Sequence, residues 1–192
     1  MNTIETTLTT TALYSEDNTK KYLIRKVWDE KKPSLTIILL APSTGSDVAL
    51  DSTTMLTLNN AYRLGYGSLS IVNLFATLDD FTFESAEDED KENLKIILAE
   101  AKSCDTLVYA PGVGKAKSQA FQKRSEQVLS QLRPYEKKLK CLTNADGNAR
   151  LRHPLTPALR HWVLSDVTVN EIRKTIEDAS QPPKPSGKAK HK

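Results

Sequence analysis

A proline and two hydroxyl residues end the most apolar stretch of the chain. The segment "TIILLA" runs straight into Pro42, Ser43 and Thr44, and Asp51 follows in the same polar loop. Hydroxyls and exposed backbone amides just before a helix can hold an anion or a polar ring. Asp51 is equally well placed to cap that helix, because its carboxylate can accept hydrogen bonds from the free amides of the first turn. The loop is a candidate ligand site in which Asp51 has a structural alternative.

Asn73 interrupts the apolar segment "SIVNLFA", where a buried strand prefers valine or isoleucine. A buried amide without partners costs about 1–3 kcal/mol, so this side chain needs hydrogen bonds from somewhere. Asparagine presents a donor and an acceptor side by side, which is the pattern needed to bind one edge of a nucleobase. The alternative is a structural amide that ties two loops together.

His153 lies in the segment "RLRHPLTP", directly before Pro154. A residue before proline is pushed out of the helical region, so we expect His153 in a loop. An imidazole there could donate a hydrogen bond to a developing oxyanion, and Arg152 could hold a phosphate. The alternative is a surface histidine with no function.

The segment "APGVGK" resembles a phosphate-binding loop only weakly. It lacks the full glycine spacing of that motif, and no hydroxyl residue follows the lysine. Turn formation is the simpler role for Pro111, Gly112 and Gly114.

Composition argues against a metal site, a cofactor or a membrane span. The chain has three dispersed histidines, and its two cysteines, Cys104 and Cys141, have no metal-type spacing. No apolar run is long enough to span a bilayer, and the first residues do not follow the pattern of a signal peptide. We therefore expect a cytoplasmic protein with no cofactor, no metal and no membrane partner, whose cysteines are small buried hydrophobes.

Alternating strands and helices must position these residues. The segment "KYLIRKVW" alternates apolar and charged residues, as a strand at a sheet edge does. Apolar segments typical of buried strands follow at "LTIILLA", "SLSIVNLFA", "DTLVYAPG" and "KLKCLTN". Helical spacing separates them, in "STTMLTLNNAYRLGYG", "ENLKIILAEAKSC" and "KAKSQAFQKRSEQVLSQLRPYEK", and a last helix is expected to open at "TPALRHWVL".

This order predicts an α/β fold, a three-layer αβα sandwich with a mostly parallel four-stranded sheet and an N-terminal edge strand. Residues 1–19 are expected to be a flexible N-terminus and residues 20–178 a single domain. Residues 179–192, rich in lysine, proline and glycine, are expected to be a disordered basic tail. In open parallel sheets, ligands bind beyond the carboxyl ends of the strands, where the loops described above should meet.

The chain resembles a bacterial and phage family catalogued as domain of unknown function 1643. The resemblance rests on "YLIRKVW", "LAPSTGSDVALDSTT", "LGYGSLSIVNLFATL", "DTLVYAPGVGK" and "RHPLTP", which follow one another in the family's order. It covers roughly residues 14–162, and the family name implies no activity.

More distantly, the same motif order is similar to the uracil-DNA glycosylase superfamily, an analogy at the level of fold. The resemblance implies that Pro42 belongs to the first motif, that Asn73 binds a base, and that His153 stabilises the departing anion. The departure lies at Ala41, where those enzymes carry a water-positioning aspartate or asparagine. Alanine cannot orient water, so either an acidic residue of the loop, Asp47 or Asp51, has taken that role or no hydrolysis occurs.

Three functions stay open on the sequence alone. The first is a binding module for a nucleobase, nucleotide or nucleic acid such as DNA. The second is an N-glycosidic hydrolase in which Asp51 positions water, His153 stabilises the leaving group and Phe75 stacks on the base. The third is a protein-interaction domain whose pocket has degenerated.

Overall fold

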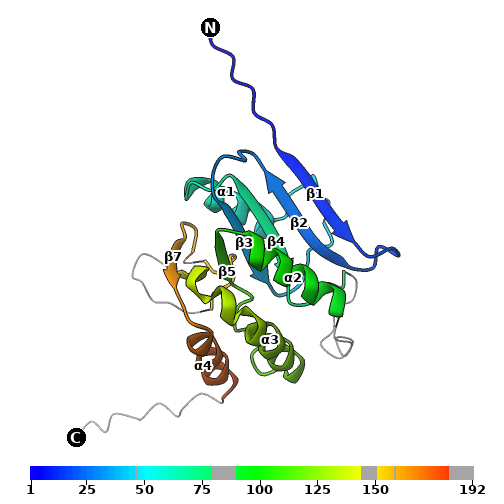
Figure 1. Ribbon diagram of the computed structural model, residues 1–192, viewed down its shortest axis with the longest axis vertical. Helices are drawn as coiled ribbons and strands as arrows, with labels where there is room; N and C mark the ends of the chain where they lie inside the picture. The colour runs from blue at the N-terminus through cyan, green and yellow to red at the C-terminus, as the bar shows by residue number, and fades with distance from the viewer. Residues whose placement is uncertain (46, 79–89, 144–150, 158, 182–192) are drawn as a thin grey trace, which may run out of the picture.

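One seven-stranded sheet organises the chain, as the ribbon in Figure 1 shows. The computed structural model describes residues 1–45, 47–78, 90–143, 151–157 and 159–181. In chain order the strands are β1 (Thr9–Tyr14), β2 (Lys21–Val27), β3 (Ser34–Leu39), β4 (Ser68–Asn73), β5 (Thr106–Tyr109), β6 (Leu139–Thr143) and β7 (Val163–Asp166). Their order across the sheet is β1-β2-β4-β3-β5-β6-β7.

Four parallel strands form the middle of the sheet. β4 pairs with β3, β3 with β5, and β5 with β6, all in parallel. Each of these strands follows one of the apolar segments in the sequence, and Ile37 and Ile38 in β3 are fully buried. Strands covered on both faces need apolar residues at every position, which explains the continuous apolar runs. The prediction of an α/β fold is confirmed.

The number of strands and the identity of the edge strand were predicted wrongly. β1 and β7 add antiparallel strands at the two sides, so β2 is an inner strand. β1 lies in a threonine-rich stretch that we expected to be flexible, and pairing with β2 gives it a structure that its own sequence does not announce. The charges of β2 misled the prediction, because Lys21 and Lys26 are buried and bonded within the protein.

The described part of the chain has four α-helices, of which the first three connect the parallel strands. They are α1 (Ser52–Arg63), α2 (Lys91–Ser103), α3 (Gln119–Leu132) and α4 (Val169–Ser180), with a 3-10 helix (Arg133–Lys138) before β6. The first three lie where helical spacing predicted them. The helix expected to open at "TPALRHWVL" was predicted wrongly, because β7 occupies the end of that segment and α4 begins only after Thr168. Thr168 and Glu171 form a capping box that marks the true start.

The two faces of the sheet are covered differently. α2 and α3 pack on one face and α1 on the other (Figure 1). The face under α2 and α3 has the larger hydrophobic cluster, which includes Ile97, Phe121 and Leu129. The α1 face has a smaller cluster that includes Ile37, Ala61 and Trp162. Within the described ranges, the sheet therefore has one face packed by several helices and one face packed by α1 alone.

No helix among the described residues has the length and apolar character needed to cross a membrane. The basic tail lies outside the described residues from residue 182 onward. The domain boundaries and the cytoplasmic location stay predictions.

Candidate functional site

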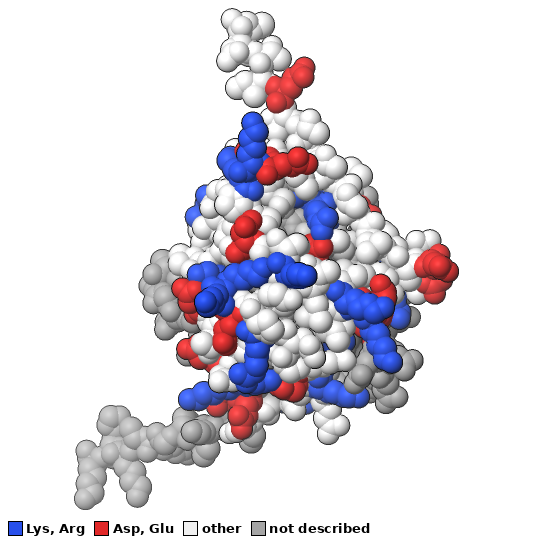
Figure 2. All heavy atoms as spheres, in the orientation of Figure 1, with Lys and Arg blue, Asp and Glu red and all other residues white. Residues whose placement is uncertain are grey.

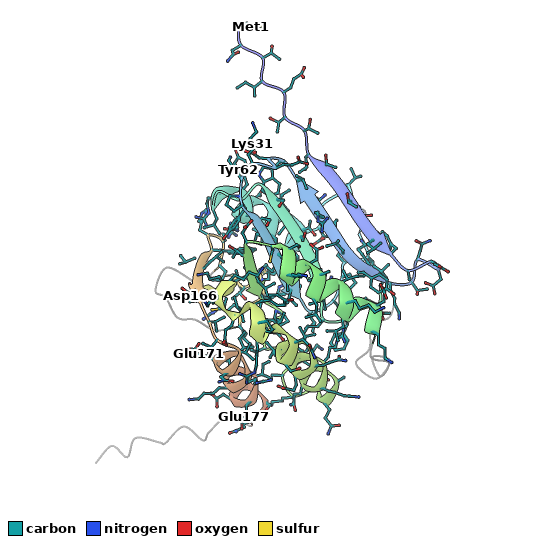
Figure 3. All side chains as sticks on the ribbon, viewed as in Figure 1. Met1, Lys31, Tyr62, Asp166, Glu171 and Glu177 are labelled. Atoms are coloured by element: carbon teal, nitrogen blue, oxygen red, sulfur yellow. The ribbon has the colours of Figure 1, made fainter. Side chains whose placement is uncertain are left out.

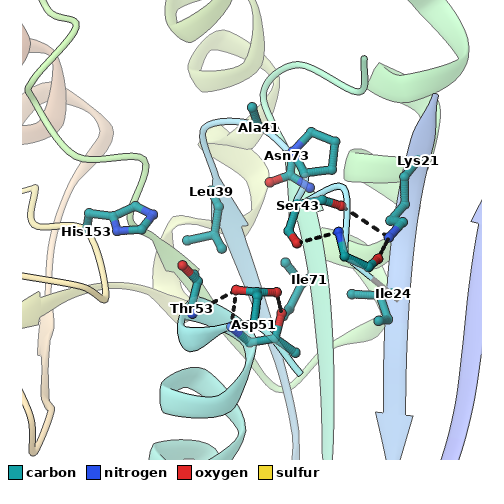
Figure 4. A pocket seen from close by; sticks show the side chains of 13 residues that line it. Lys21, Ile24, Leu39, Ala41, Ser43, Asp51, Thr53, Ile71, Asn73 and His153 are labelled. Atoms are coloured by element: carbon teal, nitrogen blue, oxygen red, sulfur yellow. Dashed lines mark hydrogen bonds between the residues drawn. The ribbon is translucent and has the colours of Figure 1, made fainter. Parts of the chain in front are cut away.

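A cavity of about 220 Å³ opens on the α1 face, at the carboxyl ends of β3 and β4 (Figure 4). Apolar side chains form part of its wall, and polar groups from four separate segments face into it. Its lining residues are Lys21, Ile24, Leu39, Ala41, Pro42, Ser43, Gly45, Asp51, Thr53, Thr54, Ile71, Asn73 and His153.

Sheet topology brings these distant segments together. Leu39 at the end of β3 lies directly beside Asn73 at the end of β4, in parallel register. β2 runs antiparallel to β4, so its first residue, Lys21, lies at the same edge of the sheet. Paired residues project to the same face, and Ile24 and Ile71 therefore join Asn73 on the cavity side. The carboxyl ends of the parallel strands form the site, as the rule for open sheets predicts.

Asn73 is the least exposed of the buried polar residues that line this cavity. The side chain is 4% exposed, and its Oδ1 atom has no hydrogen-bond partner among the described residues. Its main-chain oxygen, in contrast, accepts a hydrogen bond of 3.0 Å from the Asn93 side chain of α2 on the opposite face. Buried polar atoms are almost always bonded, so an unpartnered one needs an explanation. The Oδ1 of Asn93 is also without a partner among the described residues, but Asn73 is the one of the two that lines the cavity.

Asp51 is the N-cap of α1. Its Oδ1 accepts hydrogen bonds from the backbone amides of Thr53 (2.8 Å) and Thr54 (3.1 Å), and its Oδ2 accepts one from the Thr54 hydroxyl (2.6 Å). Burial acts to raise the pKa of Asp51, but these hydrogen bonds and one from Ser43 outweigh it and lower the pKa. A carboxylate of lowered pKa is a weak general base. The capping alternative for Asp51 is therefore observed.

His153 faces the cavity as a neutral imidazole. Burial lowers its pKa, although the nearby Asp51 carboxylate acts in the opposite direction. The backbone amide of Leu155 donates to Nδ1 at 3.2 Å, so Nδ1 carries no proton in the neutral ring. The proton must then lie on Nε2. Figure 4 shows the ring pointing into the cavity, and the one hydrogen bond found for it among the described residues is the bond to Nδ1.

Two contacts place the segment that carries His153. Gly112, in the loop after β5, has a positive φ of 77°, and a Cβ atom there would lie 3.2 Å from the Cβ of His153. Glycine therefore allows the backbone turn and the close approach together. Further along the segment, Asn60 of α1 accepts a hydrogen bond from the Trp162 amide (2.9 Å), and Arg63 donates to the Trp162 carbonyl (2.6 Å). α1 thus anchors the chain that follows His153.

Lys21 holds the loop between β3 and α1. Its ammonium group donates to the carbonyls of Ser43 (3.3 Å) and Gly45 (3.2 Å) and forms an ion pair with Asp47 (3.1 Å). Burial acts to lower the pKa of Lys21, but bonds to Tyr14 and Asp47 outweigh it and raise the pKa. An ammonium group has three donors, and all three are used. Lys21 is a structural cation and is not available to a ligand anion.

The structure brings together five of the eight residues predicted from the sequence. Pro42, Ser43, Asp51, Asn73 and His153 line the same cavity. Thr44, Phe75 and Arg152 do not.

The three residues outside the cavity are placed differently from one another. Thr44 is exposed in the loop. Phe75 is 8% exposed and belongs to the cluster under α2 and α3, so the proposed stacking partner lies on the other face of the sheet. Arg152 is half-buried, and its Nε atom has no partner among the described residues.

Sequence reasoning missed the apolar wall and the residues that position the polar groups. Ile24, Leu39 and Ile71 read as ordinary core residues, and only the register shows which of them face the cavity. Lys21 read as a charge of an edge strand. Gly112 could have been noticed, because a glycine after a buried strand often marks a place where another segment approaches the backbone closely. The sequence could not show that His153 is the residue that approaches.

A metal centre is not indicated. Among the described residues there is no group of three or more His, Cys, Asp or Glu side chains that could hold an ion.

Comparison with known proteins gives a family and no activity. No curated protein matches the chain. The family model described as "Protein of unknown function (DUF1643)" matches residues 21–155, more than two thirds of the 192 residues. The matched segment contains every residue that lines the cavity, whereas β1, β7 and α4 lie outside it. The chain therefore belongs to the DUF1643 family of proteins of unknown function.

Proposed function

We propose that the cavity binds a nucleobase, free or as part of a nucleoside or a nucleic acid strand, without breaking a bond. The observation that carries this proposal is the buried, unpartnered amide oxygen of Asn73 in a cavity that His153 also faces. The two side chains offer an acceptor and donors to a single polar ring. A nucleobase edge has the matching pattern of donors and acceptors.

The size and walls of the cavity support a small flat ligand. Its volume of about 220 Å³ lies below the roughly 300–1,000 Å³ of pockets for drug-sized molecules. Leu39, Ile24 and Ile71 provide apolar surface for the faces of a ring, while Asn73 and His153 fix its edge. This combination of apolar walls and a few polar groups is typical of small-molecule sites.

The charges in the cavity favour a neutral ligand. Lys21 and Asp51 are its charged lining residues, and Lys21 is already paired with Asp47. No uncompensated cation among the described lining residues is left for a phosphate. We therefore expect bases and nucleosides to bind more tightly than their 5′-monophosphates.

The residues present support binding more than hydrolysis. Ala41 stands where the distantly similar uracil-DNA glycosylases carry a water-positioning side chain, and Asp51 is engaged as a helix cap. The similarity to that superfamily supports a ligand of the nucleobase type by analogy of fold alone.

Titration calorimetry with a panel of bases, nucleosides, nucleotides and single-stranded oligonucleotides tests the proposal. We expect one base class to bind, and Asn73→Ala to weaken it at least about tenfold, because the variant lacks the group that pairs with the ring. Asn59→Ala is the matched control, since Asn59 is an exposed amide on α1. Absence of binding by every member of the panel at millimolar concentration would reject the proposal.

A second measurement separates binding from hydrolysis. Each ligand that binds is incubated with the protein, and the release of free base is followed by chromatography. We expect none. Base release that disappears in Asp51→Ser would establish the hydrolase instead, because serine keeps the helix cap and removes the carboxylate.

A further inference from the structure

The free edge of β1 and the residues before it form a surface with no partner in the described part of the chain. β1 pairs with β2 on one side only, and the last paired residue is Thr9, opposite Val27. Residues 1–8, which we call the arm, continue beyond the end of β2 and are exposed throughout. Figure 3 shows Met1 at the tip of the arm, far from the sheet.

The arm has the alternating pattern of a strand that continues β1. Thr10, Ala12 and Tyr14 are half-buried in β1, and every second residue before them would face the same way. Those residues include Ile4 and Leu8, which are 83% and 47% exposed. The apolar face of the strand therefore extends past the sheet that it belongs to.

β1 also lacks most of the features that normally protect an edge, and its irregular pairing with β2 is confined to its end, between Leu13 and Tyr14. Natural edge strands carry lysine, proline or bulges, or they are very short. No charged residue and no proline occurs between Thr6 and Tyr14, and Glu5 is the single charged side chain of the arm. The projecting arm in Figure 2 is accordingly almost uniformly white. The opposite edge differs, because β7 has four residues and ends at the charged Asp166.

We propose that two copies of the chain pair antiparallel through β1 and the arm. The strand has a free edge and an apolar extension. In a pair related by a two-fold axis, the arm of each copy would lie along the free edge of the other. Such a pair opposes no like charges when Glu5, the one charged side chain before Tyr14, lies opposite an uncharged residue, and threonines that lie across from threonines are favourable.

The apolar residues restrict the register. Residues opposite each other in an antiparallel pair share a face, so Ile4 must lie opposite an even-numbered residue of the partner. Ile4 meets an apolar or aromatic residue of the half-buried face of the partner strand when it lies opposite Ala12 or Tyr14. In these two registers Leu8 or Thr9, respectively, lies opposite its own counterpart. The interface would then adjoin Tyr14, whose hydroxyl donates to Asp47 in the loop beside the cavity.

Sedimentation equilibrium on the full chain tests the interface. We expect a concentration-dependent dimer, with at least tenfold weaker association in the double variant Ile4→Lys and Leu8→Lys. The double variant Thr3→Lys and Thr7→Lys is the matched control, because it adds the same charge to the opposite face of the same strand. Neither variant changes a residue of the protein's own sheet. A monomer at all concentrations, or equal association of both variants, would overturn the proposal.

Cysteine cross-linking tests the register. The native Cys104 and Cys141 are 5% and 1% exposed, so a cysteine introduced in the strand is the reactive one. In an antiparallel two-fold pair, a single position lies opposite itself. Single cysteines placed in turn at residues 7–11 should therefore cross-link best at 8 or 9 and poorly at 7 and 11. A flat profile or a maximum elsewhere would contradict this arrangement.

Discussion

Two buried asparagines meet at the end of β4 from opposite faces of the sheet, and their hydrogen bonds differ. Asn93 of α2 is fully buried, and its amide donates to the carbonyls of Asn73 (3.0 Å) and Leu74 (3.1 Å). Neither Oδ1 atom has a partner among the described residues, but Asn73 lines the cavity and Asn93 does not. The Asn93 side chain holds the end of β4 in place, and the Asn73 side chain projects from that strand end into the cavity.

The same difference separates the two faces of the sheet. Helices α2 and α3 cover one face with the larger hydrophobic cluster, and polar groups there serve the fold. The other face has α1 and a cavity, where polar groups lie at the surface of an open space. Substitutions on the first face should therefore change stability, and substitutions on the second should change binding.

The largest effect is expected in the helix-packed core. Phe121 of α3 is fully buried, so Phe121→Ala should lower the free energy of unfolding by about 3–5 kcal/mol through lost burial and the cavity left behind. Denaturant unfolding followed by circular dichroism measures this change. Met55→Ala, at a position 44% exposed on α1, should stay within about 0.5 kcal/mol of the natural protein. Equal losses in both variants would contradict the assigned burial.

The two asparagines give the sharpest form of the comparison. Asn93→Ala removes two hydrogen bonds to buried carbonyls and should cost about 1–3 kcal/mol of unfolding free energy. Asn73→Ala removes a side chain whose oxygen has no partner, so we expect no loss of stability, or a gain. The order of the two variants should reverse when ligand affinity is measured. A large destabilisation by Asn73→Ala would show that its amide is structural.

Asp51 distinguishes a cap from a reactive group. Asp51→Ala should lower the free energy of unfolding by about 0.5–2 kcal/mol, because two amides at the start of α1 lose their acceptor. Asp51→Ser should recover most of this loss, since serine is also a good N-cap. Thermal and denaturant unfolding of the two variants provide the measurement. Failure of serine to restore stability would mean that the charge of Asp51, and not its capping bonds, is what stabilises the fold.

The smallest effect concerns acid sensitivity near neutral pH. The pKa of His153 is lower in the folded protein than its ordinary value of 6.5, mainly because of burial. As the pH falls below about 6.5, the unfolded chain binds a proton first, so stability is lost until the folded-state pKa is passed. His153→Gln should flatten this part of the stability profile between pH 7.5 and 5.5. An unchanged slope in the variant would show that another group controls it.

The sequence predicted the strand ends and missed the groups around them. Three residues depart from the pattern of their own segments. Asn73 is an amide in a buried strand, Pro42 is a proline just after such a strand, and His153 is a histidine before a proline. Departures of this kind can be detected in the sequence alone. Phe75 does not line the cavity, because its side chain lies on the other face of the sheet, in the cluster under α2 and α3. The face that a side chain occupies depends on pairing with neighbouring strands and is not written in the local pattern.

β1 illustrates the same limit at the level of the fold. A run of threonines has a β propensity but only a weak apolar pattern, and pairing with β2 decides its structure. Once β1 is in place, β2 becomes an inner strand and its lysines are buried. Lys21 then uses all three donors on the loop beside the cavity, a role that no property of the segment "KYLIRKVW" indicates.

The amino-acid sequence alone determined the α/β class and the parallel strands through its local apolar runs. Breaks in those runs pointed to five residues that line one cavity. Both signals are local, because burial and backbone sterics act on each segment separately. The tertiary structure alone decided which face of the sheet each side chain occupies. It also decided that the Asp51 carboxylate caps α1 and that the Asn73 Oδ1 has no partner among the described residues. Hydrogen bonds between distant segments form only after strand register is set. The physical reason is that a one-residue change of register would send every side chain of the shifted strand, such as Asn73 in β4, to the opposite face.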